Sequence, residues 1–157
     1  MPDLKIDPKT TSMFVMDFYT ETFEKYPHSK ERNVIEKGAA LLKAGRDAGL
    51  LISYSAGVFR PGYPEKNHLY DTWYSKTGPM ASAIPFGHNH PYNTSVRPVS
   101  DPYQTIHPAV KPLDGDIVVG KHRSTALFGT DLEMVWRAKQ IKKLISPAKF
   151  DISSNRN

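Results

Sequence analysis

Four short apolar runs, separated by longer polar segments, predict the strands of a sheet. They cover residues 13–16, 50–55, 116–120 and 141–145. The first run is continuous rather than alternating, and it is partly β-branched and aromatic. That pattern is typical of a strand buried on both faces of a parallel sheet.

Helix-like spacing follows the first run and the third. Residues 33–48 predict a helix whose apolar stripe contains Val34, Ile35, Gly38, Ala39, Leu41, Leu42 and Ala48. Gly49 stands where a C-terminal cap glycine belongs. A second helix is predicted from Thr130 or Asp131 to about Lys139, with an inner face of Leu132, Val135 and Trp136. Strand, helix and strand with short joins form a βαβ unit, which favours a parallel sheet with right-handed crossovers and therefore an α/β fold.

Residues 57–115 have weak periodicity and hold nine of the thirteen prolines. A structureless loop of that length is unusual inside one compact domain, so we expect an excursion of turns and short helices. Its aromatic residues are Tyr70, Trp73, Tyr74, Phe86, Tyr92 and Tyr103. We interpret this aromatic set as packing or oligomer contact in preference to the wall of a substrate pocket.

Composition narrows the classes of protein. The chain has 157 residues, 39% apolar and 24% charged, which suits one globular domain. No apolar run approaches the ~18 residues of a membrane helix, and the N-terminus lacks a signal peptide, so we expect a cytoplasmic protein without membrane contact. The net charge of +5 is dispersed, and no basic stripe predicts nucleic-acid binding.

The 157 residues contain no cysteine. That excludes a disulfide, a thiolate zinc site and a cysteine nucleophile within them. Residues 57–115 contain four histidines that could suggest a metal site, His68, His88, His90 and His107. The signal is weak, because the segment around His88 and His90 has the pattern of a loop. We predict ordinary loop histidines, no metal and no cofactor.

Asp17 and Lys121 are the strongest candidates for chemistry. Asp17 follows the first predicted strand and Lys121 follows the third. In parallel sheets ligands bind beyond the carboxyl ends of the strands, so both side chains reach the functional edge. Taken alone, each is more often an ordinary solvated residue than a functional one. Together they are a sharper signal, because a lysine beside an aspartate in a semi-buried cleft would be held charged by the pair.

The wider context of these two residues resembles the isochorismatase-like cysteine hydrolase family from about residue 10 to residue 145. The matching segments are residues 13–18, 57–65, 106–108 and 115–132. The last, a strand followed by Lys-x-Arg-x-x-x-x-Phe-Gly-Thr-Asp-Leu, is the most specific. The resemblance implies a three-layer, Rossmann-like α/β fold with a six-stranded parallel sheet.

The resemblance also implies an Asp–Lys–Cys triad. Asp17 matches the aspartate that acts as general base and orients the nucleophile. Lys121 matches the lysine that sets the charge of the pair and contacts substrate. Phe59 and Arg60 follow the second strand and are candidate substrate-binding residues, since a guanidinium suits a carboxylate. The family cysteine attacks an amide, ester or related bond, and backbone N–H groups receive the oxyanion.

The family pattern ends near residue 146. Residues 147–157 read as a polar tail without family sequence, and the nucleophile region is absent. We therefore expect residues 1–146 to form a truncated domain that lacks its last strands and helices. Ser124 and Ser146 are weak candidates to replace the cysteine, because a serine needs an adjacent base. At the metal motif of nicotinamidase-type relatives, Ser55-Ala56-Gly57 offers no ligand.

Two functions remain open from the sequence. The first is a hydrolase acting on a small-molecule amide, ester or vinyl ether, catalytically impaired because the cysteine is missing. The alternative is a non-catalytic binding or oligomeric interaction protein on the same fold. Without a fifth strand, Leu144 and Ile145 would form an apolar edge that recruits other chains. We therefore expect a homo-oligomer or a complementing C-terminal fragment as partner.

Overall fold

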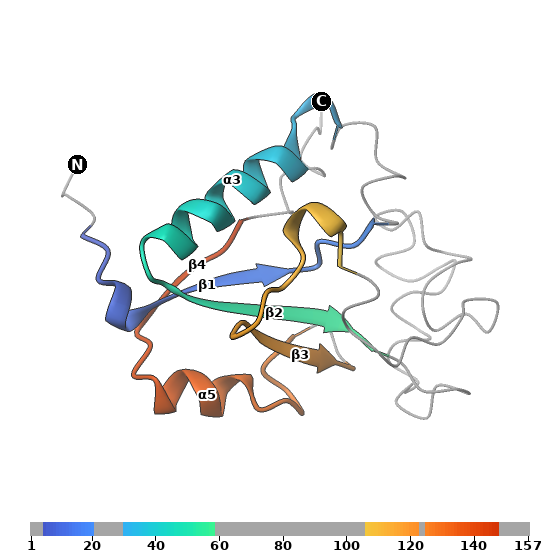
Figure 1. Cartoon of the computed structure of the whole chain (residues 1–157). Helices are drawn as coiled ribbons and strands as arrows, with labels where there is room; N and C mark the ends of the chain where they lie inside the picture. Colours follow the sequence, from blue (N-terminus) through green and yellow to red (C-terminus); the bar gives the residue numbers. More distant parts are fainter. Residues whose placement is uncertain (1–4, 21–29, 59–105, 123–124, 148–157) are drawn as a thin grey trace, which may run out of the picture. The chain divides into compact units, whose positions relative to one another are not determined.

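The computed structural model of the chain describes residues 5–20, 30–58, 106–122 and 125–147. Apart from Val58, these residues belong to one compact unit, drawn from Met1–Gly57 and Asp101–Asn157. Its four strands are β1 (Thr11–Met16), β2 (Leu51–Gly57), β3 (Ile117–Lys121) and β4 (Lys143–Ile145). They form a parallel sheet in the order β3-β2-β1-β4, with β1 and β2 at its centre (Figure 1). The predicted parallel α/β sheet is confirmed.

Within the described ranges, one helix covers each face of the sheet. Helix α3 (Val34–Asp47) lies on one side and α5 (Leu132–Ala138) on the other, which gives three layers (Figure 1). Side chains of a strand alternate between the two faces. Met13 therefore packs in the α3 layer with Leu42, whereas Phe14 packs in the α5 layer with Trp136.

The boundaries of α3 agree closely with the prediction, but its buried stripe is narrower. Gly49 has the expected left-handed conformation, with φ of +73°, and its N–H donates to the Arg46 carbonyl. Leu41, however, is 39% exposed, so its predicted place in the stripe is wrong. The fully buried residues are Gly38, Leu42 and Gly45, and the predicted members Val34, Ile35 and Ala39 pack against the same core. Leu41 is rotated by about 100° from Leu42. Ala48 is likewise exposed, beyond the end of the helix.

The fourth strand begins two residues later than predicted. The N–H of Ile141 donates to the Trp136 carbonyl at 2.9 Å and so belongs to the end of α5. The N–H of Lys142 donates to Thr10, and pairing with β1 starts only at Lys143. Val135, predicted on the inner face of α5, is only half-buried, whereas Leu132 and Trp136 are buried.

Two further elements are short 3-10 turns, η1 (Pro8–Thr10) and η3 (Pro108–Val110). The second lies in the predicted excursion of residues 57–115, of which only 57–58 and 106–115 are described. Of the predicted tail, only Pro147 is described. No helix in the described ranges is both long and apolar enough to cross a membrane. The cytoplasmic location stays a prediction.

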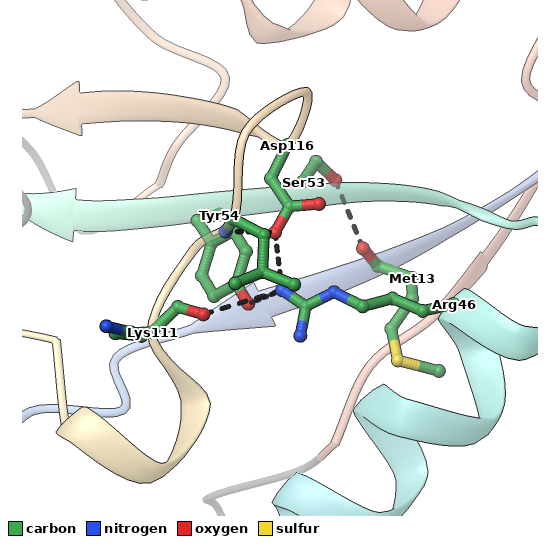
Figure 2. A network of polar contacts seen from close by, with 7 residues as sticks. Met13, Arg46, Ser53, Tyr54, Lys111 and Asp116 are labelled. Carbon is green, nitrogen blue, oxygen red and sulfur yellow. Dashed lines mark hydrogen bonds and ion pairs between the residues drawn. The ribbon is translucent and has the colours of Figure 1, made fainter.

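A polar network ties the start of β3 to α3 and β2. Arg46 in α3 forms an ion pair with Asp116, just before β3, at 2.5 Å and donates to the Tyr54 hydroxyl at 3.0 Å. Figure 2 shows the guanidinium between these groups and the Lys111 carbonyl. Asp116 also accepts from the N–H of Leu113. Burial raises the pKa of Tyr54 to about 12, although the Arg46 cation opposes that rise. The network fixes the chain that enters β3, the strand that carries Lys121.

Replacing Gly38 by alanine is expected to destabilise the fold although alanine favours helix. A Cβ at this position would stand 2.6 Å from Cε1 of Phe18, whose ring is buried in the core. Overpacking of this kind lowers the free energy of unfolding by about 1–3 kcal/mol, and the higher helix propensity of alanine raises it by about 1 kcal/mol. Denaturant unfolding of Gly38→Ala should show a net loss, whereas Ala40→Gly at an exposed site reports propensity alone. A more stable Gly38→Ala protein would contradict this packing.

Candidate functional site

Asp17 and Lys121 meet at the carboxyl edge of the sheet. Asp17 follows the last residue of β1, and Lys121 is the last residue of β3. The two strands flank β2, whose last residue, Gly57, is the register partner of Lys121. Nζ of Lys121 lies 2.8 Å from Oδ1 of Asp17, and their side chains are only 8% and 19% exposed. The two residues selected from the sequence therefore form one largely buried ion pair.

Backbone conformation contributes to the placement of Asp17. Its φ is +59°, in the left-handed region that aspartate tolerates better than most residues. This turn directs the chain away from the strand immediately after Met16. Conformations of this kind persist where the surrounding contacts hold them, often at functional sites.

Tyr19 is a third member of the site that the sequence reading missed. Its hydroxyl donates to Oδ1 of Asp17 at 2.7 Å and accepts from the N–H of Gly57 at 2.8 Å. Its backbone forms an antiparallel bridge with Ile106. The contact between Tyr19 and Gly57 joins distant parts of the chain, so no local pattern predicts it. A tyrosine two residues after Asp17 is the one signal that the sequence offers.

The environment of Tyr19 strongly favours its protonated hydroxyl. Burial is the largest cause that raises the pKa of Tyr19 well above 10, and the negative charge of Asp17 and the hydrogen bond to it add to the effect. The N–H of Gly57 acts in the opposite direction. At neutral pH Tyr19 is therefore a hydrogen-bond donor to Asp17.

Substituting Asp17 by asparagine is expected to lower the pKa of Tyr19. The charge of Asp17 disappears while burial, the largest cause, remains, so the value should fall but stay above 10. The pKa of Tyr19 is measured by an alkaline titration in which tyrosinate absorbance is recorded. The transition that is missing in Tyr19→Phe belongs to Tyr19. Since the pKa of Tyr19 is raised in the folded state, its contribution to the free energy of unfolding is fully present below pH 10. That contribution declines as the pH rises above 10. An unchanged Tyr19 transition in Asp17→Asn would show that the two groups do not interact.

The remaining candidates either lie outside the described residues or make other contacts. Phe59, Arg60 and Ser124 lie outside the described residues, as do His68, His88 and His90. Ser146 is exposed after the end of β4, and within the described ranges no base hydrogen-bonds to it. His107 caps the turn η3, where its Nδ1 accepts from the N–H of Ala109 at 3.2 Å.

Metal binding has no support in the part of the chain that the structure describes. No group of three histidine, cysteine, aspartate or glutamate side chains gathers there in a way that could hold an ion. The arrangement at the sheet edge instead offers a carboxylate, an ammonium group and a phenol. Such a set can accept a proton, neutralise charge and donate hydrogen bonds to a small polar ligand.

Comparison with known proteins gives a consistent result at the level of fold. No family model and no curated protein matches the sequence. Among solved structures, a cysteine hydrolase from Pseudomonas syringae pv. phaseolicola 1448A matches with a TM-score of 0.65 and 21% identity over 90% of this chain. An N-carbamoylsarcosine amidase from Thermoplasma acidophilum matches with a TM-score of 0.59 and 21% identity over 87% of this chain. A putative isochorismatase hydrolase from Oleispira antarctica matches with a TM-score of 0.55 and 23% identity over 90% of this chain.

The match covers most of this chain but a smaller part of the other proteins. It spans 60% of the Pseudomonas protein, 67% of the Thermoplasma protein and 62% of the Oleispira protein. Similarity at this level of identity concerns the backbone, and the parallel order of the strands agrees with the fold expected from the sequence motifs. The described chain has the α/β fold of the isochorismatase-like cysteine hydrolases.

Proposed function

We propose that this chain is a domain of an isochorismatase-like hydrolase that binds a small-molecule amide, ester or vinyl ether beside Asp17 and Lys121. The observation that carries the proposal is the ion pair of 2.8 Å between these residues, from the ends of two different strands. A largely buried pair at the carboxyl edge of a parallel sheet is placed where such folds bind ligands. The similarity of fold to known hydrolases supports the reaction class.

The two residues have different roles in this proposal. Asp17 is placed to orient a nucleophile and to accept its proton wherever one is supplied, because a carboxylate at a fixed position acts as a general base. Lys121 neutralises the carboxylate and places a positive charge beside an electronegative atom of the ligand. The Lys121 side chain is 8% exposed, so charge placed near it is only weakly screened by water.

The proposal includes impaired catalysis by the 157-residue chain alone. Hydrolysis of this type uses a nucleophile that is activated by a neighbouring base. The chain has no cysteine, and in the described residues the hydroxyl of Ser146 has no base as partner. We expect ligand binding to persist and turnover to be slow or absent.

A binding and turnover assay with defined probes tests both parts. Benzamide, benzoate and methyl benzoate are added to the purified chain, with melting temperature and product formation by NMR as readouts. We expect a melting shift with at least one probe, and loss of the shift in Lys121→Met and Asp17→Asn. Lys142→Met, at an exposed lysine, serves as the matched control. Equal shifts in the wild type and Lys121→Met would contradict the site, and turnover that depends on Lys121 would contradict the impairment.

The edge strand β4 favours an interaction role as a second candidate. In the described part of the sheet β4 pairs only with β1, over three residues, and Leu144 is 49% exposed. Such an edge presents backbone N–H and C=O groups to another strand. We propose that a second copy of this chain covers it, since a two-fold arrangement brings the same edge from both protomers together.

Native mass spectrometry tests this association. The expected result is a multiple of 17.7 kDa that reverts to the monomer mass when Leu144 is replaced by lysine. A monomer of 17.7 kDa would contradict the proposal. A complex with a different polypeptide would assign the edge to a separate partner instead of a second copy.

A further inference from the structure

We propose that Tyr19 is a positioning residue for Asp17, which holds one carboxylate oxygen in place and leaves the other, Oδ2, to face the ligand. This inference rests on the proposed function for the identity of the site. Its structural part, the orientation of the carboxylate, can be tested without any ligand.

Two donors converge on the same oxygen of Asp17. Nζ of Lys121 lies 2.8 Å from Oδ1, and the Tyr19 hydroxyl donates to Oδ1 at 2.7 Å. Within the described residues Oδ2 has no hydrogen-bond partner, and the Asp17 side chain is 19% exposed. A carboxylate has about four acceptor positions over its two oxygens. The side of the carboxylate that remains available is therefore Oδ2.

The direction of the Tyr19 hydrogen bond is fixed by Gly57. The N–H of Gly57 can only donate, and it donates to the Tyr19 oxygen at 2.8 Å. The hydroxyl proton is then committed to Asp17, in a chain that runs from Gly57 through Tyr19 to Oδ1. Hydrogen bonds in such a chain polarise one another and strengthen the last bond. A single donor without this support would leave the carboxylate freer to rotate.

The backbone around Tyr19 is itself held. Tyr19 forms an antiparallel bridge with Ile106, and the carbonyl of Phe18 accepts from the N–H of His107 at 2.7 Å. Phe18 is 2% exposed and packs in the layer of α3. These backbone contacts hold Tyr19 in place, so its hydroxyl restricts the orientation of the Asp17 carboxylate. The backbone of Asp17 itself has a left-handed φ.

The test is carboxyl NMR of protein labelled with ¹³C in aspartate, with Asp17→Asn identifying the resonance of Asp17. In Tyr19→Phe we expect the Asp17 carboxyl resonance to shift at constant pH, and the amide of Gly57 to exchange about twofold to tenfold faster after losing its acceptor. Tyr54→Phe is the matched control. It removes another phenol hydroxyl of the same sheet and should move the Asp116 resonance instead, because the Tyr54 hydroxyl shares Arg46 with Asp116.

An Asp17 resonance that shifts no more in Tyr19→Phe than in Tyr54→Phe would overturn the proposal. A general loss of structure would shift all aspartate resonances together and is thereby distinguished. The functional part is tested by benzamide affinity, which we expect to fall in Tyr19→Phe and to remain in Tyr54→Phe. If the wild type binds no probe but the Asp17 signature responds to Tyr19, the proposed function fails while the orientation of the carboxylate stands.

Discussion

Replacing Trp136 by alanine is expected to lower the free energy of unfolding by about 3–5 kcal/mol, as for other large buried aromatic residues. Trp136 is 8% exposed, and its ring meets Phe14 edge-on at a centroid distance of 5.2 Å. Its Nε1 donates to Ser53, whose hydroxyl is hydrogen-bonded to Ser12. The substitution removes one of the two buried side chains that α5 contributes to this cluster, and it leaves a buried hydroxyl with one partner fewer.

Denaturant unfolding measures this loss, with Met134→Ala as the control on the same helix. Met134 is 65% exposed, so its truncation should change stability by less than about 0.5 kcal/mol. Trp136→Phe keeps one aromatic ring but loses Nε1 and part of the buried indole, so its loss should lie between those of Met134→Ala and Trp136→Ala. A Trp136→Ala protein as stable as Met134→Ala would mean that α5 does not pack on this face.

Replacing Asp116 by alanine is expected to lower the free energy of unfolding by about 2–3 kcal/mol. Removal of one partner of a buried ion pair costs about 3–5 kcal/mol, and the figure is reduced here because the Arg46 side chain is 25% exposed. The N–H of Leu113 also loses its acceptor. The entry into β3 should loosen, and with it the position of Lys121.

Asp47→Ala provides the comparison for this second prediction. Asp47 also pairs with a cation, Lys43, but their side chains are 63% and 76% exposed. Exposed pairs contribute about 0–1 kcal/mol, so this variant should be almost as stable as the wild type. Equal losses in the two variants would show that the Arg46 network does not stabilise the start of β3.

The strands were predictable because burial on both faces of a sheet leaves a continuous apolar run. Their parallel direction was predictable because a helix is predicted between the first and second strands and between the third and fourth. The meeting of Asp17 with Lys121 follows from the same rule, since the carboxyl ends of parallel strands share one edge. Leu41 was misassigned because neighbouring leucines on a helix point in directions about 100° apart, and composition alone does not say which one faces the sheet. The start of β4 was misplaced because Ile141 is apolar but closes α5.

Contacts that join distant segments could not be read from local patterns. Tyr19 reaches Gly57 only because β1 and β2 are adjacent, and the pairing of Ser12 with Ser53 depends on the register of those strands. Polar residues inside a strand read as interruptions of an apolar run. In the folded chain they hydrogen-bond to each other and to Trp136 in the layer of α5.

The central claim is that Asp17 and Lys121 form one small-molecule site at the carboxyl edge of the sheet. The most direct test is a titration of the ¹⁵N-labelled chain with benzamide, followed through its amide resonances. We expect changes concentrated at Asp17, Gly57 and Lys121, and their disappearance in Lys121→Met. Changes confined to residues far from this edge, or the absence of any change, would contradict the claim.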